Sequence, residues 1–319
     1  MESLLDVVRD CDNYPYPEDP DPTVYNDLQR TLWKFYLPED PQPHGLLIDS
    51  VVRAMPWTSD FDIVSHPYKE VRLRRPAGPD WQSQCTQIIA HQMERARELG
   101  VFPQLGRLRG EWFPIVGARF PVAIDRSAFS MWGIIGQGVH MTVYTRNATG
   151  WQFWIPQRNP NKSTYPGLLD NAVAGGMAMG ETPRECLVRE AGEEAGLSAD
   201  VVEKEARAAG TVTWMNISDA RAGGQVGLIN PGVLFVYDLE INEQEVLRPV
   251  DGDVYAFHRM GMLEVKEALL RKRFKPSSGA VMLDFLIRHG LVNPEEEKHY
   301  AEIVTRLHRK LPLPCSASA

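Results

Sequence analysis

Three glutamates at helical spacing, Glu190, Glu193 and Glu194, form the pattern in this 319-residue chain that most directly suggests chemistry. Their i, i+3 and i+4 positions place three carboxylates on one face of a helix. Like charges so close together destabilise a bare helix, which indicates that a cation lies between them. Hard divalent cations such as Mg²⁺ take oxygen ligands and share their sites with substrate phosphates. The cluster therefore predicts a site that binds a metal ion together with a diphosphate.

The flanking residues predict the helix that positions these glutamates. The stretch 182–185, TPRE, has an N-cap hydroxyl, a proline suited to the first helical position and a glutamate that completes a reciprocal capping box. An apolar stripe follows at helical spacing, and Gly196 supplies a C-terminal stop. Gly175 and Gly176 precede the helix in a loop, where bulkier side chains would hinder close approach of the backbone to a metal ion or phosphate.

Composition and charge narrow the class of protein. Hydrophobic residues make up 43% of the sequence and charged residues 24%, which is ordinary for a folded chain. The net charge of −8 argues against a nucleic-acid surface, because phosphate-backbone binding needs a basic patch. No stretch approaches the roughly 20 apolar residues of a membrane span, and four scattered cysteines predict neither a zinc site nor a disulfide framework. We expect a cytoplasmic monomer or homodimer that acts on a small-molecule diphosphate.

Periodicity divides the remainder of the chain at a Gly- and Pro-rich stretch, residues 101–121. Before it we predict an α+β module, residues 1–120, with helices over 23–36, 45–55 and 83–99 and a strand or hairpin over 61–73. After it, residues 121–310 should form a second domain, with strands over 138–145, 151–155, 210–215, 233–239 and 254–258 and helices over 262–271, 277–289 and 294–310. Residues 311–319 are predicted to be a disordered tail.

The run from 175 to 197, GGMAMGETPRECLVREAGEEAGL, resembles the signature box of the Nudix hydrolases at every fixed position. This resemblance implies an α/β fold, the Nudix α/β/α sandwich, here with the additional N-terminal α+β module. It also implies that Arg189 and Glu181 form a salt bridge that braces the loop against the helix. The metal ion, Mg²⁺ with Mn²⁺ as the alternative, is expected on the carboxylates of Glu190 and Glu194 with Glu193 assisting, and on the backbone carbonyl of Ala174 or Gly175.

Further segments resemble one Nudix subfamily, the fungal and plant group related to the Nudix part of fungal thiamine pyrophosphokinase fusions. These segments are 138–140, 158–176, 235–240, 251–254 and 274–290. The resemblance implies Mg²⁺-dependent hydrolysis of thiamine diphosphate, and of its oxy and oxo analogues, to the monophosphates. Where this subfamily leads us to expect DGEV, residues 251–254 are DGDV, so Asp253 is one methylene shorter than the expected glutamate. The general base is left open between Glu190 and a carboxylate outside the box.

Candidate substrate contacts follow from the chemistry of the implied substrate. A cationic thiazolium and a pyrimidine ring need aromatic faces and a few polar groups, for which the candidates are Trp132, His140 and Trp214. Arg158 and Lys162 flank the loop before the box and are predicted to hold the diphosphate as cationic donors.

Three alternative functions remain open from the sequence. The first is a Nudix pyrophosphatase for nucleotide diphosphate derivatives such as NADH or ADP-ribose. The second is an isomerase of the isopentenyl-diphosphate type, which needs a catalytic Cys-Glu pair that the lone Cys186 of the box fits poorly. The third is a catalytically silent binding module, against which the complete set of box residues argues.

Overall fold

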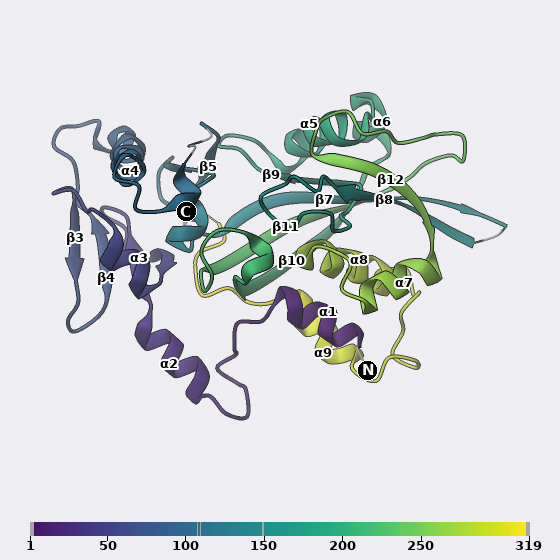
Figure 1. Cartoon of the computed structure of the whole chain (residues 1–319), viewed down its shortest axis with the longest axis horizontal. Coiled ribbons are helices and arrows are strands. Elements are labelled where there is room, and N and C mark those ends of the chain that lie inside the picture. The colour runs from purple at the N-terminus through teal and green to yellow at the C-terminus, as the bar shows by residue number, and fades with distance from the viewer. Residues whose placement is uncertain (1–2, 107, 109, 149, 317–319) are drawn as a thin grey trace.

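A mixed sheet forms the centre of the C-terminal part of the chain (Figure 1). The computed structural model describes residues 3–106, 108, 110–148 and 150–316. Among these residues the strand order is β10-β11-β7-β8-β12, with β9 added along β7. β7 and β11 run parallel, and the other neighbouring strands are antiparallel. The strands are β7 (Gly136–Asn147), β8 (Gly150–Arg158), β9 (Val173–Gly176), β10 (Arg207–Ile217), β11 (Ile229–Glu240) and β12 (Val254–Gly261).

Helices cover both faces of this sheet, because its strands carry apolar side chains on each side. Val139, Met141 and Val143 of β7 pack beneath α5 (Pro183–Ala195) and α6 (Ala199–Glu205). Tyr144 belongs to the core on the opposite face. That face is covered by α1 (Leu4–Cys11), α7 (Met262–Leu270), α8 (Pro276–Arg288) and α9 (Tyr300–Leu307). The predicted α/β/α sandwich is therefore confirmed.

The N-terminal module has a separate core at the other end of the molecule (Figure 1). Its four-stranded sheet has the order β2-β1-β4-β3 and is accompanied by three helices and a two-stranded hairpin, β5-β6. The elements are α2 (Thr23–Thr31), β1 (Trp33–Tyr36), β2 (Pro43–Leu47), α3 (Asp49–Ala54), β3 (Phe61–Val64), β4 (Glu70–Leu73), α4 (Trp81–Glu98), β5 (Trp112–Pro114) and β6 (Ala123–Asp125). The predicted α+β character of this module is confirmed.

The structure revises the predicted domain boundaries. Helix α1 packs against α8 and α9, so the first residues of the chain complete the second domain. The N-terminal core continues through Ile124 to Ile134, beyond the predicted boundary at residue 120. Leu311 and Leu313 are buried and Pro314 lies against Gly117, so the tail predicted to be disordered is packed through residue 314; residues 317–319 lie outside the described part. Apolar side chains gain from burial wherever the surface accepts them, even at a chain terminus.

Several predicted elements differ in type or extent. Residues 33–36 and 45–47, which were predicted to be helical, belong to strands β1 and β2, because these two strands pair with each other in the N-terminal sheet. The predicted helix over 294–310 is restricted to α9, Tyr300–Leu307. Within the described ranges, none of the helices combines the length and apolarity that a membrane-spanning segment requires.

Candidate active site

Helix α5 begins and ends where local chemistry requires. The Thr182 side chain accepts a hydrogen bond from the backbone N–H of Glu185, and the Glu185 carboxylate accepts from the backbone of Thr182, so the capping box is complete. Pro183 occupies the first turn, and Gly196 ends the helix in the left-handed conformation with φ of 67°. The predicted capping box is thus confirmed, and the helix is anchored at both ends.

The three glutamates of α5 differ in their surroundings. Glu194 faces strand β9, and its Oε2 accepts a hydrogen bond of 2.8 Å from the backbone N–H of Ala174 on that strand. Glu190 is also largely buried, with 13% of its side chain exposed. Glu193 is 53% exposed and lies at the rim of a cleft beside the helix. The helix therefore presents two carboxylates inward and a third at the entrance.

The absence of a side chain at Gly175 makes room for Glu190. A Cβ at this position would lie 2.0 Å from Cδ and 2.3 Å from Oε1 of Glu190. The carbonyl oxygen of Gly175 in turn lies against Gly138 of β7. The glycine thus lets the box helix place a carboxylate directly on strand β9. Gly175 and Gly176 were predicted to lie in a loop, but they pair with β7 as the end of β9, and the close approach of Glu190 leaves little room for a larger residue at position 175.

Arg189 connects the box helix to the loop before it. Its Nε and Nη2 donate to the two carboxylate oxygens of Glu181 at 2.6 and 3.0 Å, which is the predicted salt bridge in bidentate form. Its Nη1 also contacts Glu190 at 2.7 Å and Glu193 at 3.1 Å. The hydrogen bond to Arg189 lowers the pKa of Glu181, so this bracing pair is charged throughout the neutral range.

Burial of the two inner carboxylates changes their proton affinity. Burial, followed by the nearby charge of Glu190, raises the pKa of Glu194 to about 8. Burial likewise raises the pKa of Glu190, although Arg189 opposes this effect. Two carboxylates that resist ionisation side by side are a common feature of sites built to receive a cation or to exchange protons.

This arrangement predicts that the metal-free protein loses stability with rising pH. In the unfolded chain Glu194 releases its proton near its ordinary pKa of 4.5, whereas the folded protein retains it up to about 8. Folding therefore takes up a proton in this window, and the free energy of unfolding should fall by about 1–3 kcal/mol between about pH 5 and about pH 8. Urea unfolding in EDTA across this range checks the sign; a free energy that instead rose and was unaffected by Glu194→Gln would contradict the assignment.

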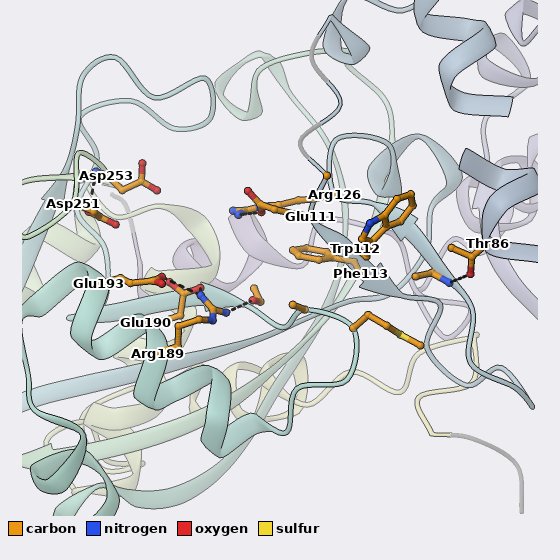
Figure 2. Close-up of a pocket in the computed structure, with 15 residues that line it drawn as sticks. Thr86, Glu111, Trp112, Phe113, Arg126, Arg189, Glu190, Glu193, Asp251 and Asp253 are labelled. Carbon is orange, nitrogen blue, oxygen red and sulfur yellow. Dashed lines mark hydrogen bonds and ion pairs between the residues drawn. The ribbon is translucent and has the colours of Figure 1, made fainter. Parts of the chain in front are cut away.

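A cleft of about 740 Å³ opens above the box helix, between it and the hairpin β5-β6 (Figure 2). The box side contributes Arg189, Glu190 and Glu193, and the loop before β12 contributes Asp251 and Asp253. The N-terminal module contributes the opposite wall, which is formed by Thr86, Gly110, Glu111, Trp112, Phe113, Ala123 and Arg126. Among the described lining residues, five carry carboxylates and two are arginines, so this part of the lining is acidic.

The donor set of the cleft fits a hard divalent cation. Glu190 and Glu194 offer carboxylate oxygens, and burial raises the pKa of both, so a bound cation would stabilise their ionised forms. Within the described residues, no group of three or more His, Cys, Asp or Glu side chains is arranged to hold a metal ion directly. Arg189 instead neutralises Glu190 and Glu193. Backbone oxygen, water or substrate oxygen would have to complete the coordination, as is usual for Mg²⁺.

A buried ionic cluster missed in the sequence lies next to Glu194. Asp170 is paired with Arg158 at 2.8 Å and lies 4.0 Å from Nζ of Lys275, at the start of α8. Burial alone would raise the pKa of Asp170, but Lys275 and Arg158 hold it below its usual range. The charges of Lys275 and Glu194 also interact. Lys275 was not singled out in the sequence, although it lies in a matched segment, because nothing local distinguishes it from a surface lysine.

None of the five predicted substrate-binding residues is among the described residues that line the cleft. The prediction for Trp132 is wrong: its side chain is completely buried in the N-terminal core, where its ring packs edge-on against Phe35. Trp214 also lies elsewhere, because its ring covers Gly232 of the neighbouring strand on the face opposite α5. Both rings serve packing in this structure.

The polar candidates have structural partners as well. His140 is 2% exposed, its Nδ1 donates to Asn171 Oδ1 at 2.6 Å, and burial lowers its pKa to about 4, so the ring is neutral. Arg158 donates to the carbonyls of Thr164 and Tyr165 besides Asp170, which fixes the loop before the box. These contacts give His140 and Arg158 bracing roles in this structure, and their contact with a substrate stays a prediction.

Lys162 and Asp253 form an ion pair at the edge of the cleft. Asp253 is among the lining residues, so the shorter acid of the DGDV segment does reach the cleft. Its backbone N–H is bonded to Asp251 Oδ1 at 2.9 Å, and the N–H of Asp251 is bonded to the carbonyl of Glu193 at 3.1 Å. The loop is therefore held against the box helix, and Lys162 lies at the rim.

Cys186 provides a further test of the alternatives. The thiol is fully buried, donates to the carbonyl of Gly176 at 3.4 Å, and has its pKa raised to about 12 by burial. A buried, protonated thiol outside the cleft cannot act as the acid or base of an isomerase.

Comparison with known proteins identifies relatives of this chain. The family model described as NUDIX domain matches residues 136–285. An uncharacterized protein of Saccharomyces cerevisiae is 38% identical over 199 residues, which cover 60% of this chain and 58% of that protein. Nudix hydrolase 20, chloroplastic, of Arabidopsis thaliana is 33% identical over 229 residues, 70% of this chain and 58% of the relative. Nudix hydrolase 24, chloroplastic, of the same plant is 34% identical over 232 residues, which cover 72% of this chain and 60% of the relative. The chain thus spans less than two thirds of the length of each of these relatives.

Proposed function

We propose, from the premise that residues 136–285 form a NUDIX domain, that this protein is a metal-dependent hydrolase of a small-molecule diphosphate. The bond cleaved is the phosphoanhydride, and the substrates are thiamine diphosphate and its oxy and oxo analogues. Water adds to one phosphorus, the bridging oxygen leaves with the other phosphate, and the products are a monophosphate and inorganic phosphate. The single observation that carries this proposal is the pair Glu190 and Glu194, two largely buried carboxylates on one helix face beside a cleft whose described lining is acidic.

Each residue of the site would have a separate role. Glu190 and Glu194 would hold the metal, Mg²⁺ with Mn²⁺ as a substitute, assisted by Glu193 and by the carbonyl of Ala174 or Gly175. A bound divalent ion supplies charge neutralisation at phosphoryl oxygens and a more acidic water. The ion pair between Arg189 and Glu181 holds the loop against the helix. A carboxylate removes the proton from the attacking water, either Glu190 or one of Asp251 and Asp253, which line the same cleft.

The thiamine assignment is supported by the resemblance of the matched segments and by the character of the cleft. A thiazolium ring is planar and cationic, and the cleft offers an aromatic wall together with an excess of carboxylates. A nucleotide such as ADP-ribose or NADH is the alternative, because an adenine ring would stack on the same wall.

We further propose a cytoplasmic protein that is a monomer or homodimer.

A substrate panel tests this proposal. Thiamine diphosphate, its oxy and oxo analogues, NADH, ADP-ribose and nucleoside triphosphates are incubated with Mg²⁺, and the phosphate and monophosphate formed are measured. We expect turnover of the thiamine compounds that is abolished by EDTA and restored by Mg²⁺ or Mn²⁺. Turnover of the nucleotides alone would retain the diphosphatase chemistry and overturn the substrate. Absence of turnover across the panel would contradict the enzyme proposal itself.

A further inference from the structure

The hairpin β5-β6 is joined directly to the loop that precedes the box helix. The backbone N–H of Met179 donates to the carbonyl of Trp112 at 2.7 Å. The ring of Phe113 lies against Gly176, where an added Cβ would come within 2.6 Å of Cζ of the ring. The N-terminal module therefore meets the catalytic loop through backbone hydrogen bonding and close packing, and the two form one continuous site.

Two side chains of this hairpin enter the cleft without being fully used in packing. Trp112 is 37% exposed, which is unusual for a large aromatic residue that lies beside carboxylates. The Arg126 side chain is 38% exposed, and its Nη1 is paired with Glu111 at 2.7 Å. Figure 2 shows Arg126 and Glu111 in the space between Trp112 and the carboxylates of Glu193 and Asp251. Both side chains are thus available to a molecule bound in the cleft.

The charge balance of the cleft indicates what Arg126 is for. Arg189, the other arginine among the described lining residues, is already bound to Glu181, Glu190 and Glu193. Arg126 is within electrostatic range of Glu190 and stands over the ring of Phe113, 5.5 Å from its centroid. It can exchange its exposed ion pair with Glu111 for a substrate phosphate, because exposed pairs contribute little stability and guanidinium groups bind phosphate through two parallel hydrogen bonds.

We propose that the hairpin β5-β6 is the substrate-selecting element of the active site, with Trp112 stacking on a planar ring of the substrate and Arg126 binding its phosphate. The assignment of the phosphate-cleaving site rests on the proposed function above. The ring contact does not depend on which ringed diphosphate is the substrate. The N-terminal module is then a required wall of the site, and it sets which organic group accompanies the diphosphate.

Steady-state kinetics of point variants test this assignment. Trp112→Ala is compared with Tyr68→Ala, an exposed tyrosine of the same module outside the cleft, and Arg126→Ala is compared with Arg53→Ala, an exposed arginine. The substrates are the ringed diphosphate that the wild type turns over best and isopentenyl diphosphate, which has no ring. The backbone carbonyl that binds Met179 is retained in Trp112→Ala, so the hairpin should stay docked. Thermal unfolding of each variant checks this, and Trp112→Phe serves as the conservative rescue.

We expect Trp112→Ala to raise KM for the ringed substrate roughly tenfold, with kcat changed by less than about twofold, because stacking binds ground state and transition state alike. Hydrolysis of isopentenyl diphosphate should be unaffected by this variant, and Trp112→Phe should restore most of the KM. Arg126→Ala should lower kcat/KM roughly tenfold or more for every substrate, with or without a ring.

The outcomes separate the two proposals. If the wild type is active but Trp112→Ala and Arg126→Ala behave like their controls, the hairpin assignment is overturned and the proposed function stands. If the wild type cleaves nothing in the panel, the proposed function fails, and the hairpin is tested by calorimetric titration of thiamine diphosphate and ADP in Mg²⁺. Weaker binding by Trp112→Ala than by Tyr68→Ala would then support the ring contact, whereas equal binding, or no binding by the wild type, would overturn it.

Discussion

Replacing Glu194 by glutamine is expected to lower kcat by about 10³-fold or more while the fold is retained. Glutamine has the same shape, and its side-chain oxygen can still accept the hydrogen bond from Ala174 N–H that Glu194 accepts at 2.8 Å. What is lost is a negative charge in the recess. If that charge holds a divalent ion against a phosphoryl group, its loss removes several kcal/mol of transition-state stabilisation. The measurement is phosphate release under saturating substrate, with the Mg²⁺ concentration varied.

The same substitution should stabilise the metal-free protein. Burial and the charge of Glu190 raise the pKa of Glu194 to about 8. Near neutral pH the folded protein must therefore either keep this carboxyl protonated or bury its negative charge, and both cost free energy of folding. A neutral amide avoids that cost. We expect Glu194→Gln to raise the free energy of unfolding in EDTA by about 1–3 kcal/mol near pH 7.5, and to remove most of the loss of stability between about pH 5 and about pH 8. Activity and stability thus change in opposite directions.

Glu193→Gln provides the matched control for this prediction. It lies one residue away on the same helix, but its side chain is 53% exposed and its carboxylate contacts the guanidinium of Arg189 at 3.1 Å. We expect a decrease in kcat within about tenfold and little change in stability, because exposed ion pairs contribute at most about 1 kcal/mol. Equal losses of activity in both variants, or full activity of Glu194→Gln, would refute the distinction between inner and rim carboxylates.

The box helix could be predicted from the sequence because its determinants are local. A cap at Thr182, a proline at the first helical position and the stop at Gly196 each act within one turn of the residues they constrain. The ion pair between Arg189 and Glu181 followed from the family resemblance and is present. Spacing alone placed the glutamates on one face, but it could not distinguish the inner Glu190 and Glu194 from the exposed Glu193.

Long-range pairing limited the prediction elsewhere. Residues 33–36 have apolar side chains at positions compatible with both helix and strand, and their pairing with 43–47 and with 70–72 decides the outcome. Such partners are not encoded in any local window. The buried Leu311 and Leu313 were likewise assigned to a disordered tail, because a short apolar segment does not reveal the surface on which it will pack.

The cleft itself was the part of the site least accessible from sequence. Trp112 and Arg126 lie more than 60 positions before the box glutamates and reach them only because the hairpin packs on the loop at Gly176 and Met179. Trp132 was chosen instead as an aromatic side chain suited to a substrate ring, although it is a core residue. In the sequence, an aromatic residue of a hydrophobic core looks the same as one that lines a binding site. Only the exposed fraction of its side chain in the folded protein distinguishes the two.

Gly175→Ala is expected to lower kcat by about 10²-fold and to lower the free energy of unfolding by about 1–2 kcal/mol. The added Cβ would lie 2.0 Å from Cδ of Glu190, so the carboxylate must turn away from β9 and give up its 2.7 Å contact with Arg189. The displaced atoms are the end of a flexible side chain, and the backbone of Gly175 does not have a positive φ. The strain can therefore be relieved by rotation at a cost of about 1–2 kcal/mol. A displacement of about 1 Å in a positioned catalytic group can cost about 10²-fold in rate.

Gly192→Ala is the matched control, because it adds the same methyl group within the same site region at a position where there is space. The nearest atom to its new Cβ is 3.9 Å away, and alanine is preferred over glycine in a helix interior by roughly 0.5–1 kcal/mol. We therefore expect Gly192→Ala to be fully active and slightly more stable. Measured together by steady-state kinetics and thermal unfolding, the pair separates displacement of Glu190 from general damage to the helix. Full activity of Gly175→Ala would show that the position of Glu190 on β9 is not required for turnover, and the general base would then have to be sought at Asp251 or Asp253 across the cleft.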